Sequence, residues 1–216
     1  ITQLQIQTGI ADCTGEIGGD AILDYCGVCE GDGLSCVCID YDGNIYETVW
    51  IGGQLWMAEN LKTTHYNNGD EVSYRDYDNN SNNSEVYGRL YDWYALDDSR
   101  SICPEGWHVP SDTEYVILTD FLGGSSVAGG KMKEAGFEHW NSPNTGATNE
   151  SGFTALGSGF WTGSTYHAMF WDKYLWSSTE SDDYNAWGRK LYHTNTGVAR
   201  AEMEKDKGFA IRCIKD

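Results

Sequence analysis

The alternation of apolar and polar residues predicts β-strands in two parts of the chain. In the first ten residues, Ile1, Leu4 and Ile6 alternate with Thr and Gln, with one slip in the period, which predicts a single strand that no hairpin partner follows. Between residues 38 and 61, alternation continues on both sides of an Asp-Gly-Asn turn at residues 42–44, where positive φ angles cost little. We therefore expect a β-hairpin around that turn.

A capping sequence and an apolar stripe predict a helix within residues 110–124, PSDTEYVILTDFLGG. Ser111 is a natural N-cap, and Glu114 completes an S-x-x-E capping box. A glycine pair ends this helix, and its apolar stripe consists of Tyr115, Leu118, Phe121 and Leu122. A shorter helix is predicted within residues 88–98, with one apolar side formed by Leu90, Trp93, Tyr94 and Leu96. From residue 152 to the end, the pattern predicts short strands and long polar loops.

Composition and charge limit the classes of partner. The chain has 216 residues, with 33 Asp and Glu against 14 Lys and Arg, which gives a formal net charge of −19. This charge repels nucleic acid and anionic bilayers, and it favours divalent cations. The length predicts one main domain with a small appendage, and no apolar run is long enough for a membrane span. Clustered cysteines and the absence of an initiator Met predict a mature exported protein.

Residues 12–38 are rich in cysteine, glycine and carboxylates, which predicts a small spacer. The C-x-x-C pair at residues 26–29 has zinc-ligand spacing, but Cys36 and Cys38 are separated by a single residue, which strains a tetrahedral site. A thioredoxin-like redox motif would begin a helix, and the glycines here oppose one. Calcium fits better, because hard oxygen ligands lie on a flexible backbone; the predicted ligands are Asp12, Glu16, Asp20, Asp24, Glu30 and Asp32. The alternative is a disulfide-held linker whose acidic residues are merely solvated.

The spacer contains five cysteines, so two disulfides leave one cysteine over. Cys36 and Cys38 compete most directly for the unpaired position, and the predicted bridge-forming residues are Cys13, Cys26, Cys29 and Cys36. A spare cysteine in an exported protein predicts an intermolecular bond or a free thiol. The only cysteines outside the spacer are Cys103 and Cys213, which form one disulfide or remain two buried thiols.

Five motifs in the remainder of the chain resemble a known family: VWIGGQLWMAENLKTTHYNNGD (49–70), YGRLYDWYAL (87–96), CPEGWHVPSDTEY (103–115), WSST (176–179) and GFAIRCIKD (208–216). Together they look like the Fibrobacter succinogenes major paralogous domain, over residues 39–216. That family comprises secreted and cell-surface bacterial domains, mostly of unassigned function. The resemblance implies a C-type lectin-like α+β fold with two helices, short strands, long loops and a Cys103–Cys213 disulfide. The spacer is similar to thrombospondin type 3 repeats, which implies a disulfide-stapled calcium-binding segment.

Neither a calcium-dependent sugar site nor a catalytic site follows from the resemblance. C-type lectins of that kind use E-P-N or Q-P-D together with W-N-D, and the nearest strings, at residues 142–144 and 171–173, lack the acidic residue and the amide respectively. Formylglycine-generating enzymes have a related fold but need a reactive cysteine pair near the C-terminal end, where this chain has only Cys213. The five histidines also lack metalloprotease spacing. We therefore predict that the protein is not an enzyme.

Aromatic residues between positions 160 and 184 are the candidates for ligand binding, because exposed rings stack on sugars or dock on protein partners. Trp161 and Trp176 are expected to fill the core, since large aromatic side chains are mostly buried. The predicted surface residues are Tyr166, His167 and Tyr184.

Three segments are thus predicted: an N-terminal strand (1–11), a spacer (12–38) and a lectin-like domain (39–216). An extended apolar strand can add to the sheet edge of a neighbour, so Leu4 and Ile6 are predicted to dock one copy onto the next. The resulting hypothesis is a non-catalytic, self-assembling extracellular subunit, a homopolymer that displays its domains on a filament and uses calcium as cofactor. The alternative is an adhesin that recognises a glycan or a surface protein.

Overall fold

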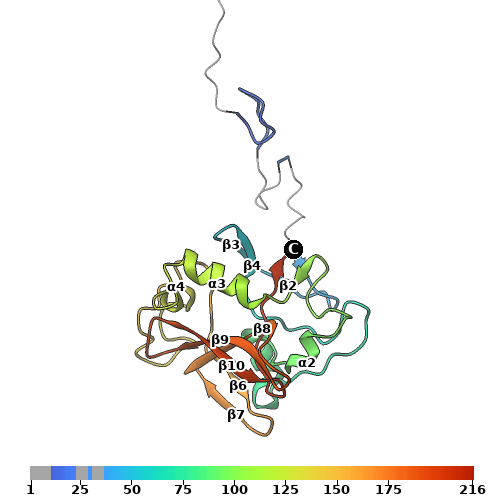
Figure 1. The fold of residues 1–216 in the computed structure, drawn as a ribbon, viewed down its shortest axis with the longest axis vertical. Helices are drawn as coiled ribbons and strands as arrows, with labels where there is room; N and C mark the ends of the chain where they lie inside the picture. The colour runs from blue at the N-terminus through green and yellow to red at the C-terminus, as the bar shows by residue number, and fades with distance from the viewer. Residues whose placement is uncertain (1–10, 23–28, 31–36) are drawn as a thin grey trace, which may run out of the picture. The chain divides into compact units, whose positions relative to one another are not determined.

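The computed structural model describes residues 11–22, 29–30 and 37–216, and the chain divides into two compact units, Ile1–Val37 and Cys38–Asp216 (Figure 1). In the described part of the first unit, a bridge pairs Ala11 with Ile17. The predicted assembly strand, including Leu4 and Ile6, lies outside the described residues. The second unit, called the head below, has a mixed α+β fold.

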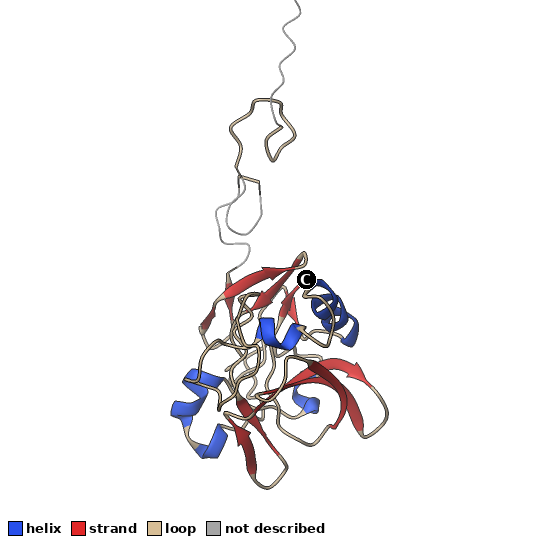
Figure 2. Cartoon of the chain, turned by 90° about the vertical axis from the view of Figure 1, so that its left-hand side faces the viewer, coloured by secondary structure: helices blue, strands red, loops and turns tan. Residues whose placement is uncertain are grey.

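The head contains three β-sheets, and nearly all of their strands are antiparallel. The smallest sheet pairs β1 (Cys38–Ile39) with β2 (Ile45–Tyr46). A second sheet has the order β3 (Thr48–Ile51), β4 (Gln54–Met57), β11 (Ile214–Lys215) and β5 (Trp107–His108). The largest sheet has the order β10 (Val198–Glu204), β9 (Asn185–Tyr192), β8 (Asp172–Glu180), β6 (Ser158–Trp161) and β7 (Tyr166–Met169), and only its β6–β8 pair is parallel. Figure 2 shows the strands of the head in red and its short helices in blue.

The predicted hairpin is present, because β1 and β2 pair on either side of the turn at residues 42–44. Gly43 has a φ of 82°, and the side chain of Asp40 accepts a hydrogen bond from the Asn44 amide at 2.9 Å. A local turn and a local side-chain acceptor therefore fix this hairpin.

The long predicted helix is α3 (Asp112–Phe121), and both hydrogen bonds of its capping box between Ser111 and Glu114 are formed. Tyr115, Leu118 and Leu122 are buried as predicted. Phe121, the remaining residue of the predicted apolar stripe, is 65% exposed, which contradicts its expected place in the core. Its ring instead covers Gly52, where an added Cβ would lie 2.7 Å from the Phe121 Cγ. Because the turn at Gly52 packs closely against the Phe121 ring, the exposed phenylalanine still has a packing partner.

The prediction of two helices was too low, because the head has four α-helices and one 3-10 turn, η1 (Tyr77–Asn79). The shorter predicted helix contains α2 (Trp93–Leu96), and the additional helices are α1 (Ser81–Tyr87) and α4 (Ala128–Met132). The α4 segment reads AGGKM and lacks the apolar period of a helix. Its two glycines are required by packing, since a Cβ on Gly129 would lie 2.2 Å from the Gly197 carbonyl oxygen. Tertiary contacts therefore override propensity here.

The core lies between the two larger sheets and α3, and it includes the fully buried Trp56, whose ring lies 5.2 Å from that of Tyr115. Trp176 is fully buried as expected, whereas Trp161 is only partly buried and lies beneath the Arg75 guanidinium. Among the described residues, no helix has both the length and the apolar character that crossing a membrane requires.

Candidate ligand-binding site

The predicted calcium ligands are partly described. Asp12 accepts hydrogen bonds from Thr14, Glu16 and Ala21: its Oδ1 lies 2.9 Å from the Thr14 amide and 3.0 Å from that of Glu16. The hydrogen bond from the Thr14 hydroxyl, followed by those from the amides, lowers the pKa of Asp12. Asp12 thus holds its own loop together. Glu16, Asp20 and Glu30 are also described, whereas Asp24 and Asp32 lie outside the described residues, so calcium binding remains a prediction.

Two disulfides are described. Cys13 is bonded to Cys29, and Cys103 to Cys213, while Cys26 and Cys36 lie outside the described residues. Cys38 is a free thiol that is completely buried, and burial raises its pKa to about 12. A neutral, inaccessible thiol is a poor nucleophile, so Cys38 is a packing residue.

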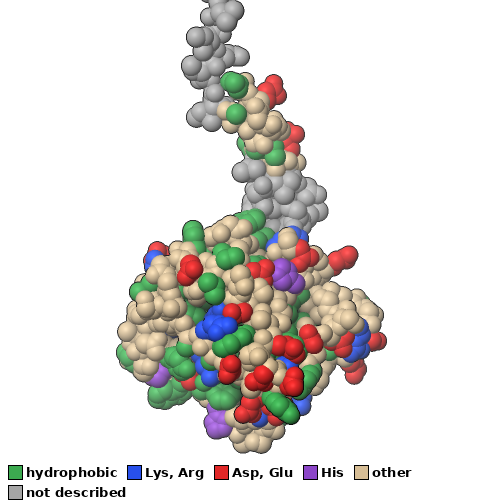
Figure 3. All heavy atoms as spheres, in the orientation of Figure 1, with side chains coloured by type: hydrophobic (Ala, Val, Ile, Leu, Met, Phe, Trp, Pro, Cys, Tyr) green, Lys and Arg blue, Asp and Glu red, His purple; other side chains and the backbone are tan. Residues whose placement is uncertain are grey.

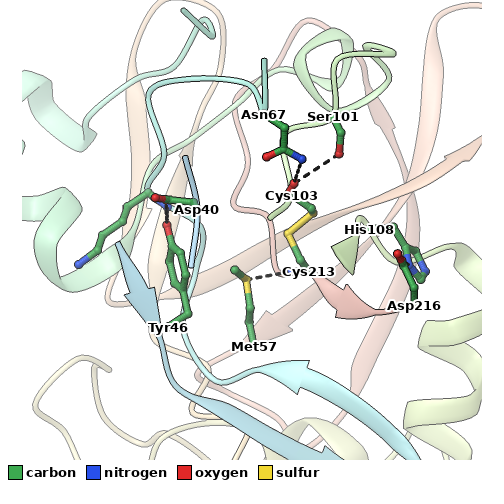
Figure 4. The surroundings of a disulfide bond; sticks show 10 residues. Asp40, Tyr46, Met57, Asn67, Ser101, Cys103, His108, Cys213 and Asp216 are labelled. Atoms are coloured by element: carbon green, nitrogen blue, oxygen red, sulfur yellow. Dashed lines mark hydrogen bonds and ion pairs between the residues drawn. A yellow bond between two sulfur atoms is a disulfide. The ribbon is translucent and has the colours of Figure 1, made fainter. Parts of the chain in front are cut away.

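The Cys103–Cys213 disulfide lies inside the head and is held from both ends (Figure 4). The Asn67 side chain donates to the Cys103 carbonyl at 2.7 Å, and the Cys213 amide contacts the Met57 sulfur at 3.2 Å. Nearby, His108 hydrogen-bonds to Asp216 through Nδ1 at 2.6 Å and to Glu114 through Nε2 at 2.9 Å. These contacts tie the C-terminal strand to the rest of the head.

The three predicted ligand-binding residues do not gather at one point. Tyr166 on β7 donates to the Asn79 side chain at 3.0 Å, and its ring contacts that of Tyr77. His167 is exposed and lies 5.8 Å, between ring centroids, from Phe160. Tyr184, in the turn between β8 and β9, is 80% exposed. Tyr184 lines a hollow in the surface.

This hollow, called the tyrosine hollow below, has a volume of about 330 Å³ and is lined by Tyr94, Tyr184, Glu204 and Asp206. Tyr94 on α2 is 60% exposed, so both tyrosines present most of their rings to solvent. Lys207 lies between the two carboxylates: its Nζ is 2.8 Å from Glu204 Oε2 and 2.9 Å from Asp206 Oδ1. The hydrogen bond to Glu204 has the larger effect and that to Asp206 the next, and both raise the pKa of Lys207. Figure 3 shows that acidic side chains gather in the lower part of that face of the head.

Lys205 joins the three chain segments that form the tyrosine hollow. Its amide donates to the Tyr184 carbonyl at 3.0 Å, and its carbonyl accepts from the Trp93 amide at 2.9 Å. Its buried side chain lies 2.5 Å from Glu180 and 4.6 Å above the Trp93 ring. The positions of α2, the β8–β9 turn and the end of β10 are therefore coupled through one residue.

A second hollow, called the aromatic groove below, adjoins the first, because Glu204 lines both. It measures about 410 Å³, within the size range of small-molecule sites. Its aromatic side comes from Phe160, Tyr174 and Phe209, with the Tyr174 ring 4.5 Å and 5.3 Å from the other two centroids. Lys190 pairs with Tyr174 across the β8–β9 ladder, and burial lowers the pKa of its ammonium group. Tyr174 and Phe209 are buried and Phe160 is partly exposed, so the groove combines one accessible aromatic ring with hydrogen-bonding groups.

Tyr94 is exposed, although the sequence pattern predicts it on the apolar side of its helix. The α2 helix is a single turn, so Trp93, Ala95 and Leu96 are buried while Tyr94 extends outward. Glu204 and Asp206 belong to the run EKDK at residues 204–207, whose alternating charges were the available signal. Nothing local indicates that this run meets Tyr94, which lies about one hundred residues earlier in the sequence.

Comparison with protein families gives a match to the head. The family model described as the Fibrobacter succinogenes major domain matches residues 49–215, most of the head. No curated protein and no solved structure gives a significant match.

Proposed function

The chain belongs to the Fibrobacter succinogenes major domain family, and we propose that it is a non-catalytic, extracellular binding module that holds a saccharide in the tyrosine hollow and the adjoining aromatic groove. The observation that carries this proposal is the pairing of two exposed tyrosines with two carboxylates around one hollow of about 330 Å³. We further propose that the α+β head has a C-type lectin-like fold.

The chemistry of the hollow suits a sugar. A pyranose ring has an apolar C–H face that packs on an aromatic ring, and a rim of hydroxyls that both donate and accept hydrogen bonds. Tyr94 and Tyr184 offer ring faces, while Glu204 and Asp206 offer acceptors that Lys207 holds in position. Charged acceptors make stronger hydrogen bonds than neutral ones, so they add selectivity for vicinal hydroxyls.

The charge of the site narrows the class of saccharide. The chain has a net charge of −19, and two carboxylates line the tyrosine hollow. A sugar acid would be repelled, whereas a neutral oligosaccharide would not be. The two adjoining hollows, which share Glu204, offer room for more than one sugar unit. We therefore propose neutral oligosaccharides as ligands.

The extracellular location rests on the disulfides. Cys13–Cys29 and Cys103–Cys213 are both described, and disulfides persist mainly in oxidising compartments. The self-assembly hypothesis depends on Leu4 and Ile6, which lie outside the described residues, so it gains no structural support over the binding hypothesis.

A glycan array that contains neutral and acidic oligosaccharides tests the proposal. The full chain is expected to bind neutral members, and Tyr184→Ala and Tyr94→Ala are each expected to weaken binding by about tenfold, because each removes a stacking ring. Tyr41→Ala is the matched control, since Tyr41 is 56% exposed and lines neither hollow. The proposal fails if the chain binds no glycan, or if Tyr41→Ala weakens binding as much as the other two variants.

A further inference from the structure

A separate cluster of metal-binding side chains lies after α4, in the loop that leads to Trp140. Glu134, Glu138 and His139 each offer a ligand atom, and these atoms lie within 4.8 Å of one another. The His139 Nδ1 atom lies 2.9 Å and 3.0 Å from the two carboxylate oxygens of Glu134. One nitrogen and two carboxylate groups therefore converge on a volume that a single ion could occupy.

The electrostatics of this cluster favour a cation. Two carboxylates lie close together, and within the described residues neither forms an ion pair with a lysine or an arginine. Glu134 is paired only with His139 there. Since the Tyr87 ring lies edge-on to His139 at 5.5 Å, an aromatic wall and two acidic groups enclose the imidazole.

The backbone that carries the cluster is fixed at several points. The side chain of the buried Asn144 donates to the carbonyls of Glu134 and Gly136 at 2.9 Å and 2.8 Å. The Glu134 amide donates to the Ala155 carbonyl, and the His139 carbonyl accepts from the Gly157 amide. Ligands on a fixed backbone lose little freedom when a metal binds, which favours affinity. Glu138 is exposed, so its side chain can move toward an ion without disturbing the core.

We propose that Glu134, Glu138 and His139 form a binding site for a divalent transition-metal ion, with Zn²⁺ as the best chemical match. Imidazole nitrogen together with carboxylate oxygen is a typical zinc donor set, whereas calcium prefers oxygen ligands alone. Two carboxylates and a neutral imidazole balance the charge of the ion. Three protein ligands leave a coordination position for water or for a donor from another molecule. This site is separate from the calcium ligands predicted in the spacer.

Calorimetric titration of the full chain with ZnCl₂ at neutral pH tests the proposal. The expected result is saturable binding of about one equivalent at the head, weakened at least about tenfold in Glu138→Gln and in His139→Gln. Glu138 is exposed, so the first variant removes a ligand without risk to folding. A parallel titration with CaCl₂ should show no difference between the wild-type chain and these variants.

His108→Gln is the matched control. His108 also contacts two carboxylates, Glu114 and Asp216, but through opposite ring nitrogens, so those groups cannot share one ion. Zinc affinity should stay within about twofold of the wild-type value in this variant. Nitrogen-15 NMR of the histidine side chains supplies a second readout: zinc should shift the His139 signals first. Absence of saturable zinc binding, or equal affinity in the wild-type chain and in His139→Gln, would refute the site.

Discussion

The Cys103–Cys213 disulfide closes a loop of 110 residues, more than half of the head, and its removal should cost a large part of the folding free energy. In the chain-entropy model, a crosslink across a loop of this length contributes about 4.8 kcal/mol at 25 °C, because it restricts the unfolded chain. A domain of this size is typically stable by about 5 to 15 kcal/mol. Both sulfurs are buried, so alanine replacements also lose a small packing contribution.

The double variant Cys103→Ala/Cys213→Ala is therefore expected to lose about 4 to 5 kcal/mol of unfolding free energy. Guanidinium unfolding followed by tryptophan fluorescence measures this loss, and the denaturant slope reports whether the unfolded state has expanded. Cys38→Ala is the matched control, because it removes a buried thiol that closes no loop, at a cost of about 1 kcal/mol. If the double variant loses no more than the control, the reasoning from loop closure is wrong.

Three further predictions concern pH, assembly and calcium. Partial burial disfavours charged His108, but hydrogen bonds to Asp216 and Glu114 outweigh it and raise the His108 pKa above the ordinary 6.5. The raised pKa contributes stability that is present below pH 6.5 and is lost as the pH rises through the folded-state pKa of His108. Unfolding free energy should therefore fall as the pH rises above 6.5, and His108→Gln should flatten that fall. If the N-terminal strand mediates assembly, deletion of residues 1–10 should convert polymers to monomers in light scattering; a chain that is monomeric before deletion contradicts this. If the spacer binds calcium, chelation should speed its proteolysis while leaving head unfolding unchanged, and equal proteolysis rates contradict this.

Elements determined by neighbours in sequence could be predicted, and elements determined by distant contacts could not. The capping box of Ser111 and Glu114 lies within four residues, so α3 is evident from the sequence alone. By contrast, α4 forms although Gly129 weakens it, because that glycine allows the Gly197 backbone to approach. Phe121 has the spacing of a core residue, yet it is exposed because it covers the turn at Gly52.

The candidate site follows the same division. Tyr184 could be proposed from composition, because an aromatic residue among polar neighbours is often exposed. Its partners could not be identified, since Tyr94 and Glu204 meet it only after α2 and the end of β10 have been joined through Lys205. The Glu134–His139 pair has a short spacing but no established motif. Only the bend of the loop brings the Glu138 carboxylate close to the Glu134 carboxylate and the His139 ring.

The few basic residues of this chain also connect its fold to its proposed ligands. Long loops leave backbone carbonyls in the interior that no strand can pair, and each of these needs a donor. Lys133, completely buried, donates to the loop carbonyls of Thr145 and Asn195 and to the carbonyl of Tyr192 at the end of β9, at 2.9 to 3.1 Å. Arg212, also buried, donates to the Thr154 carbonyl at 2.8 Å.

Because several of the 14 Lys and Arg residues are buried inside the head, its surface is more acidic than the composition of the head alone implies. Anionic partners then meet repulsion over most of the surface. Metal ions are attracted to this acidic surface. Neutral, hydroxyl-rich molecules are not repelled by it, since they need only hydrogen-bond acceptors. The same buried cations that satisfy the loops thus favour the two ligand classes proposed for the tyrosine hollow and for the Glu134–Glu138–His139 cluster.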